Sequence, residues 1–350
     1  MIKLGPLIAS EYRQAAALLH LQEEVLDQED LPVSDGSLLL QSLSFWQHWL
    51  PCSMHVSPSL YVAREDNHVL GVIALHHTGK SRGCWQIDKL VVHPDHRGRG
   101  IAQELLRYVF AQFGSQGASF FMAEVPAQNE AALTLFANCG FCRSARVTFF
   151  KFDPACVREQ KSLPDGFRPA LPHFQQALFQ LHSEVLPPAL RQSLLLSADD
   201  FKIRPPVPFT SVEITRNKLM RDRLWYWVSY ESDRKVITSA VRVSARPDQG
   251  YRVEFFVHPG WKHVGEDLVQ FTIDRLLADA PHLPIAAKIY DYQSDLQEAL
   301  ASNGFERCGE AFLLCREHWG RAKQKKQQRA STGLSQLTQP IIPLATDRSV

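Results

Sequence analysis

Hydrophobic positions in the first 150 residues follow two different periods along the chain. Apolar runs and period-two alternation, typical of strands, cover residues 2–8, 60–64, 69–76, 85–92, 119–125 and 147–152. Helical spacing of apolar residues covers residues 11–27 and 36–50, a helix that starts at residue 101, and residues 130–138. One strand, two helices, three strands and then alternating helices and strands predict an α/β (α+β) fold.

The second half of the chain repeats this pattern. Val257–Gly265 matches Val92–Gly100 at a spacing of 165 residues. Asn303-Gly304-Phe305 matches Cys139-Gly140-Phe141 at a spacing of 164 residues. A fixed period that carries the same order of elements predicts a tandem duplication of one fold.

Other features of the second half agree with a duplication. An aromatic-rich hairpin at 224–243 and a helix at 264–278 lie at the corresponding places. Length points the same way, because 350 residues exceed one ordinary domain. We therefore predict a first domain at residues 1–153, a linker at 154–165, a second domain at 166–316 and a disordered, basic and polar tail at 317–350.

A loop at residues 93–100 joins an apolar strand to a helix and contains the chain's most distinctive chemistry. The first turn of a helix has unpaired N–H groups and a partial positive charge. Gly98 and Gly100 have no Cβ, so an anion can approach the backbone closely. Arg97 and Arg99 add charged donors. The loop therefore predicts a phosphate site, and two solvated arginines on a surface loop are the alternative.

Two familiar phosphate loops do not fit this stretch. It lacks Gly-Lys-Ser/Thr, which excludes a nucleoside-triphosphate loop, and Gln103 breaks the Gly-x-Gly-x-x-Gly spacing of dinucleotide sites. The remaining pattern is Arg97-x-x-Gly100-x-Ala102 after Val-His-Pro. This pattern resembles motif A of the GNAT acetyltransferase superfamily.

A second motif follows the strand that ends near residue 125. Asn129 is a typical N-cap for a helix over 130–138, and Gly140 is a typical helix end before Phe141. Asn129-x-x-Ala132 followed by Gly140-Phe141 is similar to motif B of the same superfamily. The resemblance implies that each copy is a GNAT-like domain, with a mixed, mostly antiparallel sheet flanked by helices.

The resemblance also implies a reaction and a binding site. It implies an acetyl-CoA-dependent N-acetyltransferase that acts on an amine of a small molecule or on a protein N-terminus or lysine. Acetyl-CoA, as co-substrate, would be held by the loop, by the backbone of the strand before it and by the motif B asparagine: Leu90, Val91, Val92, Arg97, Gly98, Arg99, Gly100, Ile101, Ala102 and Asn129.

Two acidic residues are candidates for the base that accepts the amine proton. Glu124 precedes Asn129 by five residues, as the catalytic glutamate does in ribosomal-protein N-terminal acetyltransferases of the superfamily. Asp88, on the strand before motif A, is the second candidate. The alternative to a catalytic role for Glu124 is that it is a solvated glutamate at a strand end. Many family members have a tyrosine that acts as general acid for the CoA thiolate, and this chain has Phe136 at that position. Because phenylalanine has no proton to give, a non-catalytic acyl-CoA sensor or scaffold is the alternative function.

The second copy has lost the chemistry of the loop. Arg97, Gly98 and Ala102 correspond to less suitable residues, namely Lys262, His263 and Asp267. Side chains there crowd the backbone, and acidic residues at the helix start repel a diphosphate. Asn129 and Glu124 correspond to Gln293 and Lys288. We therefore predict one acetyl-CoA site, in the first copy, and a second copy that serves as structural partner and as a wall of the substrate cleft.

Composition narrows the partners and the compartment. Apolar residues make up 45% of the chain and the net charge is +1, so no overall field attracts nucleic acid or membrane. No apolar run approaches the roughly 20 residues that span a bilayer, and the N-terminus lacks the features of a secretory signal. We expect a cytoplasmic monomer or homodimer without a membrane or nucleic-acid partner. The basic residues after Gly320 leave nucleic-acid binding by the tail as an alternative.

The cysteines give no evidence for a disulfide framework, because seven are too few and too scattered. Cys139 and Cys142 have the C-x-x-C spacing of redox and zinc sites. However, Gly140-Phe141 between them already form a helix end, and no second C-x-x-C occurs. We therefore expect two half-buried thiols and no metal site.

Overall fold

Strands and helices alternate through two repeats that share a single sheet. The computed structural model describes residues 2–27, 59–78, 83–154, 166–201, 203, 223–231, 233–234, 236–246 and 250–318. The predicted helix at 36–50, most of the linker and the tail beyond residue 318 lie outside these residues. We call the elements from β1 to β6 the first repeat and those from β7 to β12 the second repeat.

Within the described residues, the first repeat has the element order that its hydrophobic pattern predicts. Its strands and helices are β1 (Lys3–Pro6), α1 (Tyr12–Asp27), β2 (Ser59–Glu65), β3 (His68–Thr78), β4 (Cys84–Val92), α3 (Ile101–Gly114), β5 (Phe120–Pro126), α4 (Glu130–Asn138) and β6 (Cys142–Phe152). Asn129 is the N-cap of α4, because its Oδ1 accepts a hydrogen bond from the Ala132 N–H at 3.0 Å. The helix ends at Gly140, whose φ of +83° favours glycine.

The second repeat has the same organisation. Its elements are β7 (Phe167–Pro169), α5 (Gln175–Val185), α6 (Pro188–Leu194), β8 (Arg223–Glu231), β9 (Val236–Arg246), β10 (Gly250–Val257), α8 (Val264–Asp279), β11 (Ile285–Tyr290), α9 (Ser294–Ser302) and β12 (Glu306–Glu317). Short 3-10 turns precede several helices and include Ala198–Phe201 and Asp291–Gln293. The predicted fold class, two tandem α/β repeats with mostly antiparallel strands, is confirmed.

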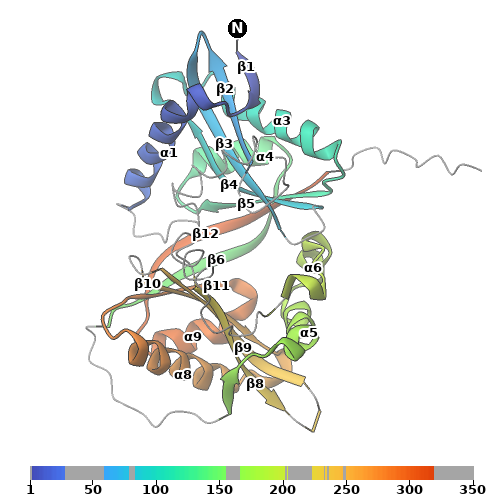
Figure 1. The fold of residues 1–350 in the computed structure, drawn as a ribbon, viewed down its shortest axis with the longest axis vertical. Coiled ribbons are helices and arrows are strands. Elements are labelled where there is room, and N and C mark those ends of the chain that lie inside the picture. Colours follow the sequence, from blue (N-terminus) through green and yellow to red (C-terminus); the bar gives the residue numbers. More distant parts are fainter. Residues whose placement is uncertain are drawn as a thin grey trace, which may run out of the picture. The chain divides into compact units, whose positions relative to one another are not determined.

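Helices cover both faces of the sheet in each repeat (Figure 1). In the first repeat α1 packs on one face through Leu18 and Leu19, whereas α3 packs on the other through Leu105 and Leu106. In the second repeat α5 and α8 take these two places. Alternate residues of a strand point to opposite faces, so in each repeat the shared sheet contributes to two separate hydrophobic cores.

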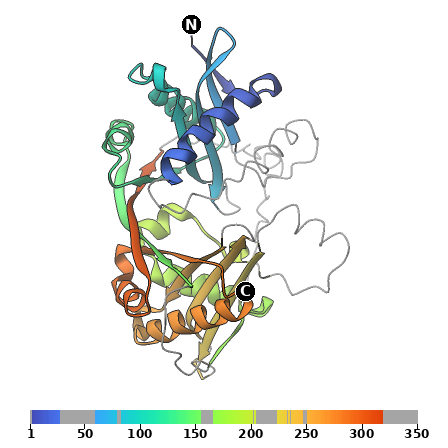
Figure 2. The same cartoon turned by 90° about the vertical axis from the view of Figure 1, so that its left-hand side faces the viewer.

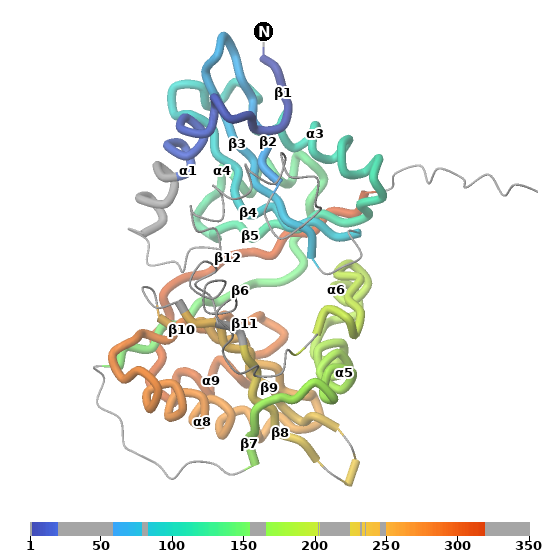
Figure 3. The backbone as a smooth tube through the Cα atoms, in the orientation of Figure 1, coloured from blue at the N-terminus to red at the C-terminus, as the bar shows by residue number. Residues whose placement is uncertain are grey.

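The two repeats exchange their last strands. The strand order is β1-β2-β3-β4-β5-β12-β6-β11-β10-β9-β8-β7, so that β12 pairs with β5 of the first repeat and β6 pairs with β11 of the second. Strands β6 and β12 also pair with each other, antiparallel, and join both repeats into one twelve-stranded sheet (Figures 2 and 3). Our expectation that each repeat occupies one continuous stretch of chain therefore describes the sequence but not the sheet.

The exchanged strands complete the core of the opposite repeat. Leu314 of β12 is 3% exposed and packs in the core beneath α3. Phe150 and Phe152 of β6 pack in the core beneath α8. Each repeat therefore depends on the other for part of its buried apolar surface.

Candidate functional site

The site predicted from sequence lies where β4 and β5 stop pairing. These parallel strands pair only over Cys84–Ile87 and Phe120–Ala123. Beyond that point both strands continue, β4 to Val92, without pairing to each other. Asp88 and Glu124 are the first residues after the pairing ends, and we call this place the first divergence. The two predicted bases therefore lie on either side of it.

A bulge in β4 distinguishes Asp88 from its neighbours. Ala74 of β3 pairs with Lys89 and Leu75 pairs with Ile87, so that Asp88 is the extra residue. A bulge redirects a side chain and interrupts the ladder, and it commonly occurs beside active sites. The Asp88 carboxylate accepts a hydrogen bond from Nδ1 of His76, on β3, at 2.8 Å.

The glycine loop lies between β4 and α3. Gly98 and Gly100 both have φ of +77°, in the left-handed region that favours glycine. A Cβ built on either glycine would meet no atom of the described chain within 4 Å, so both peptides face open space. The Glu104 N–H is the first of the helix to bond a preceding carbonyl, that of Gly100 at 3.0 Å. The N–H groups of Ile101 and its next neighbours therefore precede the helical ladder.

The two arginines of the loop are held by protein groups. Arg97 Nε donates to the Val92 carbonyl at 3.4 Å. Arg99 contacts His96 Nδ1 at 2.7 Å and Glu65 at 3.4 Å. These contacts draw both guanidinium groups back onto the protein, and an anion at the loop would compete with Glu65 for Arg99.

The two motif B positions have different surroundings. Asn129 is exposed, and its Oδ1 caps α4, which leaves its side-chain amide N–H groups as the donors for a ligand. Phe136 is 5% exposed and packs edge-on against Phe141, with ring centroids 4.9 Å apart. It therefore belongs to the core and supplies no proton.

The second repeat contains a corresponding divergence that is closed. Strands β10 and β11 pair over Tyr251–Val253 and Ile285–Ala287, and Glu254 and Lys288 follow. The side chain of Gln293 bridges the two strands beyond this point. Its Nε2 donates to the Phe255 carbonyl at 2.8 Å, and its Oε1 accepts from the Tyr290 N–H at 3.2 Å. The Gln293 amide thus takes backbone groups that an outside ligand would need.

Two further differences separate the repeats. The β9–β10 register runs without a shift from Gly250 to Val257, so β10 lacks the bulge of β4. The loop before α8 has His263 in a right-handed helical conformation at the position that Gly98 occupies in the first repeat. Lys262 in the same loop pairs with Asp295 at 2.8 Å. These differences give a physical basis for expecting one coenzyme site, in the first repeat.

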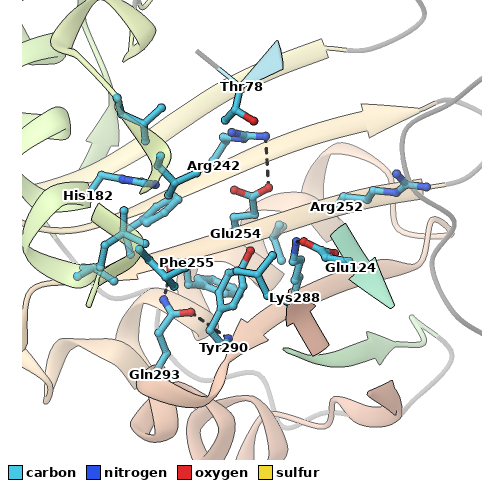
Figure 4. Close-up of a pocket in the computed structure, with 18 of the residues that line it drawn as sticks. Thr78, Glu124, His182, Arg242, Arg252, Glu254, Phe255, Lys288, Tyr290 and Gln293 are labelled. Carbon is cyan, nitrogen blue, oxygen red and sulfur yellow. Dashed lines mark hydrogen bonds and ion pairs between the residues drawn. The ribbon is translucent and has the colours of Figure 1, made fainter. Parts of the chain in front are cut away.

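Both divergences open into one cavity of about 520 Å³ (Figure 4). Asp88 and Glu124 line it from the first repeat, and Glu254 and Lys288 line it from the second. The Lys288 ammonium forms an ion pair with the Glu124 carboxylate, and each side chain is about one quarter exposed. Arg242 pairs with Glu254 at 3.3 Å in the same wall.

The Glu124–Lys288 pair requires strong curvature of the sheet. The order β5-β12-β6-β11 places three strand spacings, roughly 14 Å in a flat sheet, between the two residues. Glu124 is also level with Ala145 of β6 through Leu313, whereas Lys288 is level with Phe149. The exchanged strands must therefore twist and curl so that the two ends face each other across the cavity.

Burial and pairing shift the pKa values of several groups in the cavity. Burial alone would lower the pKa of Lys288, but the Glu124 carboxylate, with Tyr290, raises it above the usual range of a lysine. Burial raises the pKa of Tyr290 to about 12. Burial lowers the pKa of His182 to about 4, so this imidazole is neutral at physiological pH. Lys288 therefore stays charged in the cavity because Glu124 balances it, whereas His182 is neutral there.

Sequence reasoning found part of this cavity. Asp88 and Glu124 were candidate residues, and the second copy was expected to form a wall of the substrate cleft. His76 was missed, because a histidine near a strand end carries no distinctive signal. Lys288 was noted only as a loss from the second copy, and its contact with Glu124 depends on the curvature of the sheet.

Cys139 is half-buried, as expected, whereas Cys142 is exposed. Cys142 is the first residue of β6, where the strand emerges from the helix turn.

Within the described ranges, no group of three or more metal-binding side chains occurs. No helix in the same part of the chain is long and apolar enough to cross a membrane.

In sequence, the first repeat is similar to acetyltransferases. Residues 23–141 match the model of the acetyltransferase (GNAT) family. N-acetyltransferase 8F1 of Rattus norvegicus is 31% identical over 91 residues, which cover 25% of this chain and 41% of that protein. The match thus spans less than half the length of the curated relative.

Two solved structures resemble the fold over most of this chain. A tandem GNAT protein from the clavulanic acid biosynthesis pathway gives a TM-score of 0.59 at 16% identity, over 91% of this chain and 99% of that one. A GCN5-related N-acetyltransferase from Sphaerobacter thermophilus gives 0.61 at 13% identity, over 90% and 95%. At these identities the likeness concerns the fold, and it agrees with two GNAT-like domains in one chain.

Proposed function

We propose that this chain, whose residues 23–141 match the model of the acetyltransferase (GNAT) family, transfers an acetyl group from acetyl-CoA to an amine. The coenzyme diphosphate would bind the backbone of Gly98 to Ala102, with Arg97 and Arg99 as charged donors. The pantetheine arm would lie along Leu90–Val92 in the first divergence, and Asn129 would contact the arm from the other side.

One observation carries this proposal: a loop of two left-handed glycines opens α3 beside the first divergence. The space above Gly98 and Gly100 is the space that a phosphate needs. A side chain at either position would fill it. The corresponding loop of the second repeat has His263, in a right-handed helical conformation, at the position of Gly98, which supports a single donor site.

The cavity residues suggest how the amine could react. The nitrogen must be neutral to attack the thioester carbon, and the attack forms an N–C bond while the proton leaves to a base. Glu124 and Asp88 flank the first divergence on the cavity side and are our candidates for that base. The CoA thiolate then leaves, and a thiol pKa near 8.5 allows it to leave without an acid at Phe136.

The donor site is tested by replacing Gly100 with aspartate. The carboxylate would occupy the phosphate position, and we expect acetyl-CoA affinity, measured by titration calorimetry, to fall at least a hundredfold. Gly117→Asp is a matched control, because Gly117 also has a positive φ, of +100°, and open space around its Cβ. Both variants should lose similar thermal stability. Unchanged affinity in Gly100→Asp would overturn the proposal.

A non-catalytic acyl-CoA sensor is the second candidate function, and the burial of Phe136 is the observation that favours it. Release of CoA thiol in the presence of a panel of amines separates the two. Thiol release that depends on the amine supports the transferase. Tight binding of acetyl-CoA without release on any amine supports the sensor.

A further inference from the structure

The cavity between the two repeats has one apolar side. Helix α6 contributes Leu190 and Leu194, four residues apart, and Leu186 joins them from the segment between α5 and α6. They pack against the sheet residues Met122, Phe149 and Leu313, which also line the cavity. A molecule in this part of the cavity meets a continuous apolar surface.

The opposite side is polar, but its acids are already partnered. Asp88 accepts from His76, Glu124 from Lys288 and Glu254 from Arg242. Asp200 accepts from the N–H and the hydroxyl of Ser197. Figure 4 shows Glu254 directed at Arg242 and Glu124 directed at Lys288. Among the described residues that line it, this wall therefore lacks the excess of unpaired carboxylates that binding a polycation requires.

The polar and apolar sides meet next to the first divergence. Met122 and Glu124 lie two residues apart on β5 and point to the same face, about 7 Å apart along the strand. Met122 contacts the same cluster as the α6 leucines. An amine held near Glu124 and Asp88 would thus extend its remaining atoms over Met122 and along α6.

We propose that the acceptor is a small primary monoamine with an apolar body, aliphatic or aromatic, rather than a polyamine. This inference rests on the proposed function and names its substrate class. The amine nitrogen lies at the first divergence, and the hydrocarbon lies along the apolar surface that α6 and the sheet form together. A volume of about 520 Å³ is typical of sites for small molecules. The second repeat takes part because α6 and β12, which carries Leu313, form part of this wall.

The test uses the full-length protein and linear alkylamines from butylamine to octylamine. Binding is measured by calorimetry in the presence of saturating CoA, and turnover is measured as CoA thiol release from acetyl-CoA. We expect each added methylene to improve binding and kcat/KM by about fourfold until the cavity is full. 1,8-Diaminooctane should be at least a hundredfold poorer than octylamine, because its second ammonium would lie against the leucines.

A variant locates the hydrocarbon. Leu190→Ala should reduce the preference for octylamine over butylamine by about fourfold, because one wall contact is lost. Leu276→Ala is the matched control, since Leu276 is equally buried on α8, away from the cavity. It should leave that preference unchanged. If Leu190→Ala fails to fold, the chain-length series in the unaltered protein still decides the question.

The outcomes separate the substrate class from the proposed function. Tighter binding of spermidine or 1,8-diaminooctane than of octylamine would overturn the monoamine class, as would affinity that does not depend on chain length. Acetyl-CoA binding would in that case still support the donor site. Absence of any alkylamine binding would also overturn it. Loss of both acetyl-CoA binding and amine binding would remove the proposed function itself. Binding with the expected chain-length dependence but without turnover would support the pocket and the sensor.

Discussion

Glu124 and Lys288 occupy corresponding positions of the two repeats and form an ion pair across the cavity. Both side chains are about three quarters buried, so each would be costly to leave without its partner. The pair also joins elements that belong to different repeats, β5 and β11. At the scale of single residues it is the clearest contact through which the second repeat acts on the predicted site.

Lys288→Gln should therefore lower the free energy of unfolding by about 1–2 kcal/mol, because the largely buried Glu124 carboxylate would lose the charge that balances it. Adding Glu124→Gln should recover part of this loss, since two neutral amides replace the pair. Urea denaturation measures both effects. Lys262→Gln is the control, because the Lys262–Asp295 pair is at least half exposed, and it should cost no more than about 0.5 kcal/mol. An equal loss in the two lysine variants would contradict this argument.

His182 gives the cavity a defined response to acid. Its pKa of about 4 lies below the ordinary 6.5, so the unfolded chain binds a proton that the folded chain excludes between these values. The contribution of His182 to the free energy of unfolding is therefore fully present above pH 6.5 and is lost as the pH falls toward 4. Between pH 7.5 and pH 5, the free energy of unfolding of the wild type, measured by urea denaturation, should fall by about 2 kcal/mol relative to that of His182→Gln. A difference that stays constant over this range would show that the imidazole is not protected.

At the scale of elements, local signals were sufficient for most of the fold. The cap at Asn129 and the left-handed Gly140 define α4, and the sequence predicted its residues correctly. The turn at Asp66 and Asn67, both with positive φ, likewise fixes the β2–β3 hairpin. The bulge at Asp88 was not predicted, because an extra residue in one strand depends on its pairing with β3. The bridge made by Gln293 was missed for the same reason, since its two partners lie on separate strands.

Gln293 should stabilise the second divergence through both ends of its amide. Gln293→Glu keeps the size and the acceptor for the Tyr290 N–H, but it places a carboxylate oxygen against the Phe255 carbonyl. We expect a loss of about 1–3 kcal/mol in the free energy of unfolding at neutral pH. Gln112→Glu, on the exposed surface of α3, is the matched substitution and should change stability by no more than about 0.5 kcal/mol. Equal stability of the two variants would mean that the bridge contributes nothing.

At the scale of the whole molecule, the exchange of β6 and β12 could not be predicted from the sequence. Both strands have an apolar pattern that fits either neighbour, and repeated sequences allow the same pairing within a repeat or between repeats. The predicted domain limits at 153 and 166 are therefore those of the repeat in the sequence. The hydrophobic cores instead include residues from the exchanged strands of both repeats. The same exchange brings α6, Phe149 and the second divergence to the predicted site. Residue spacing could not indicate this.

Strand exchange predicts that the two repeats unfold together. A chain that ends at residue 153 would leave β5 without its partner β12 and would expose the core that Leu314 covers. We expect it to aggregate or to remain unfolded. A chain that ends at residue 320 keeps all twelve strands and should retain the stability of the full chain. In the intact protein, calorimetry and tryptophan fluorescence should report one coincident transition. Two separate transitions, or a folded monomer of residues 1–153, would show that each repeat completes its own core.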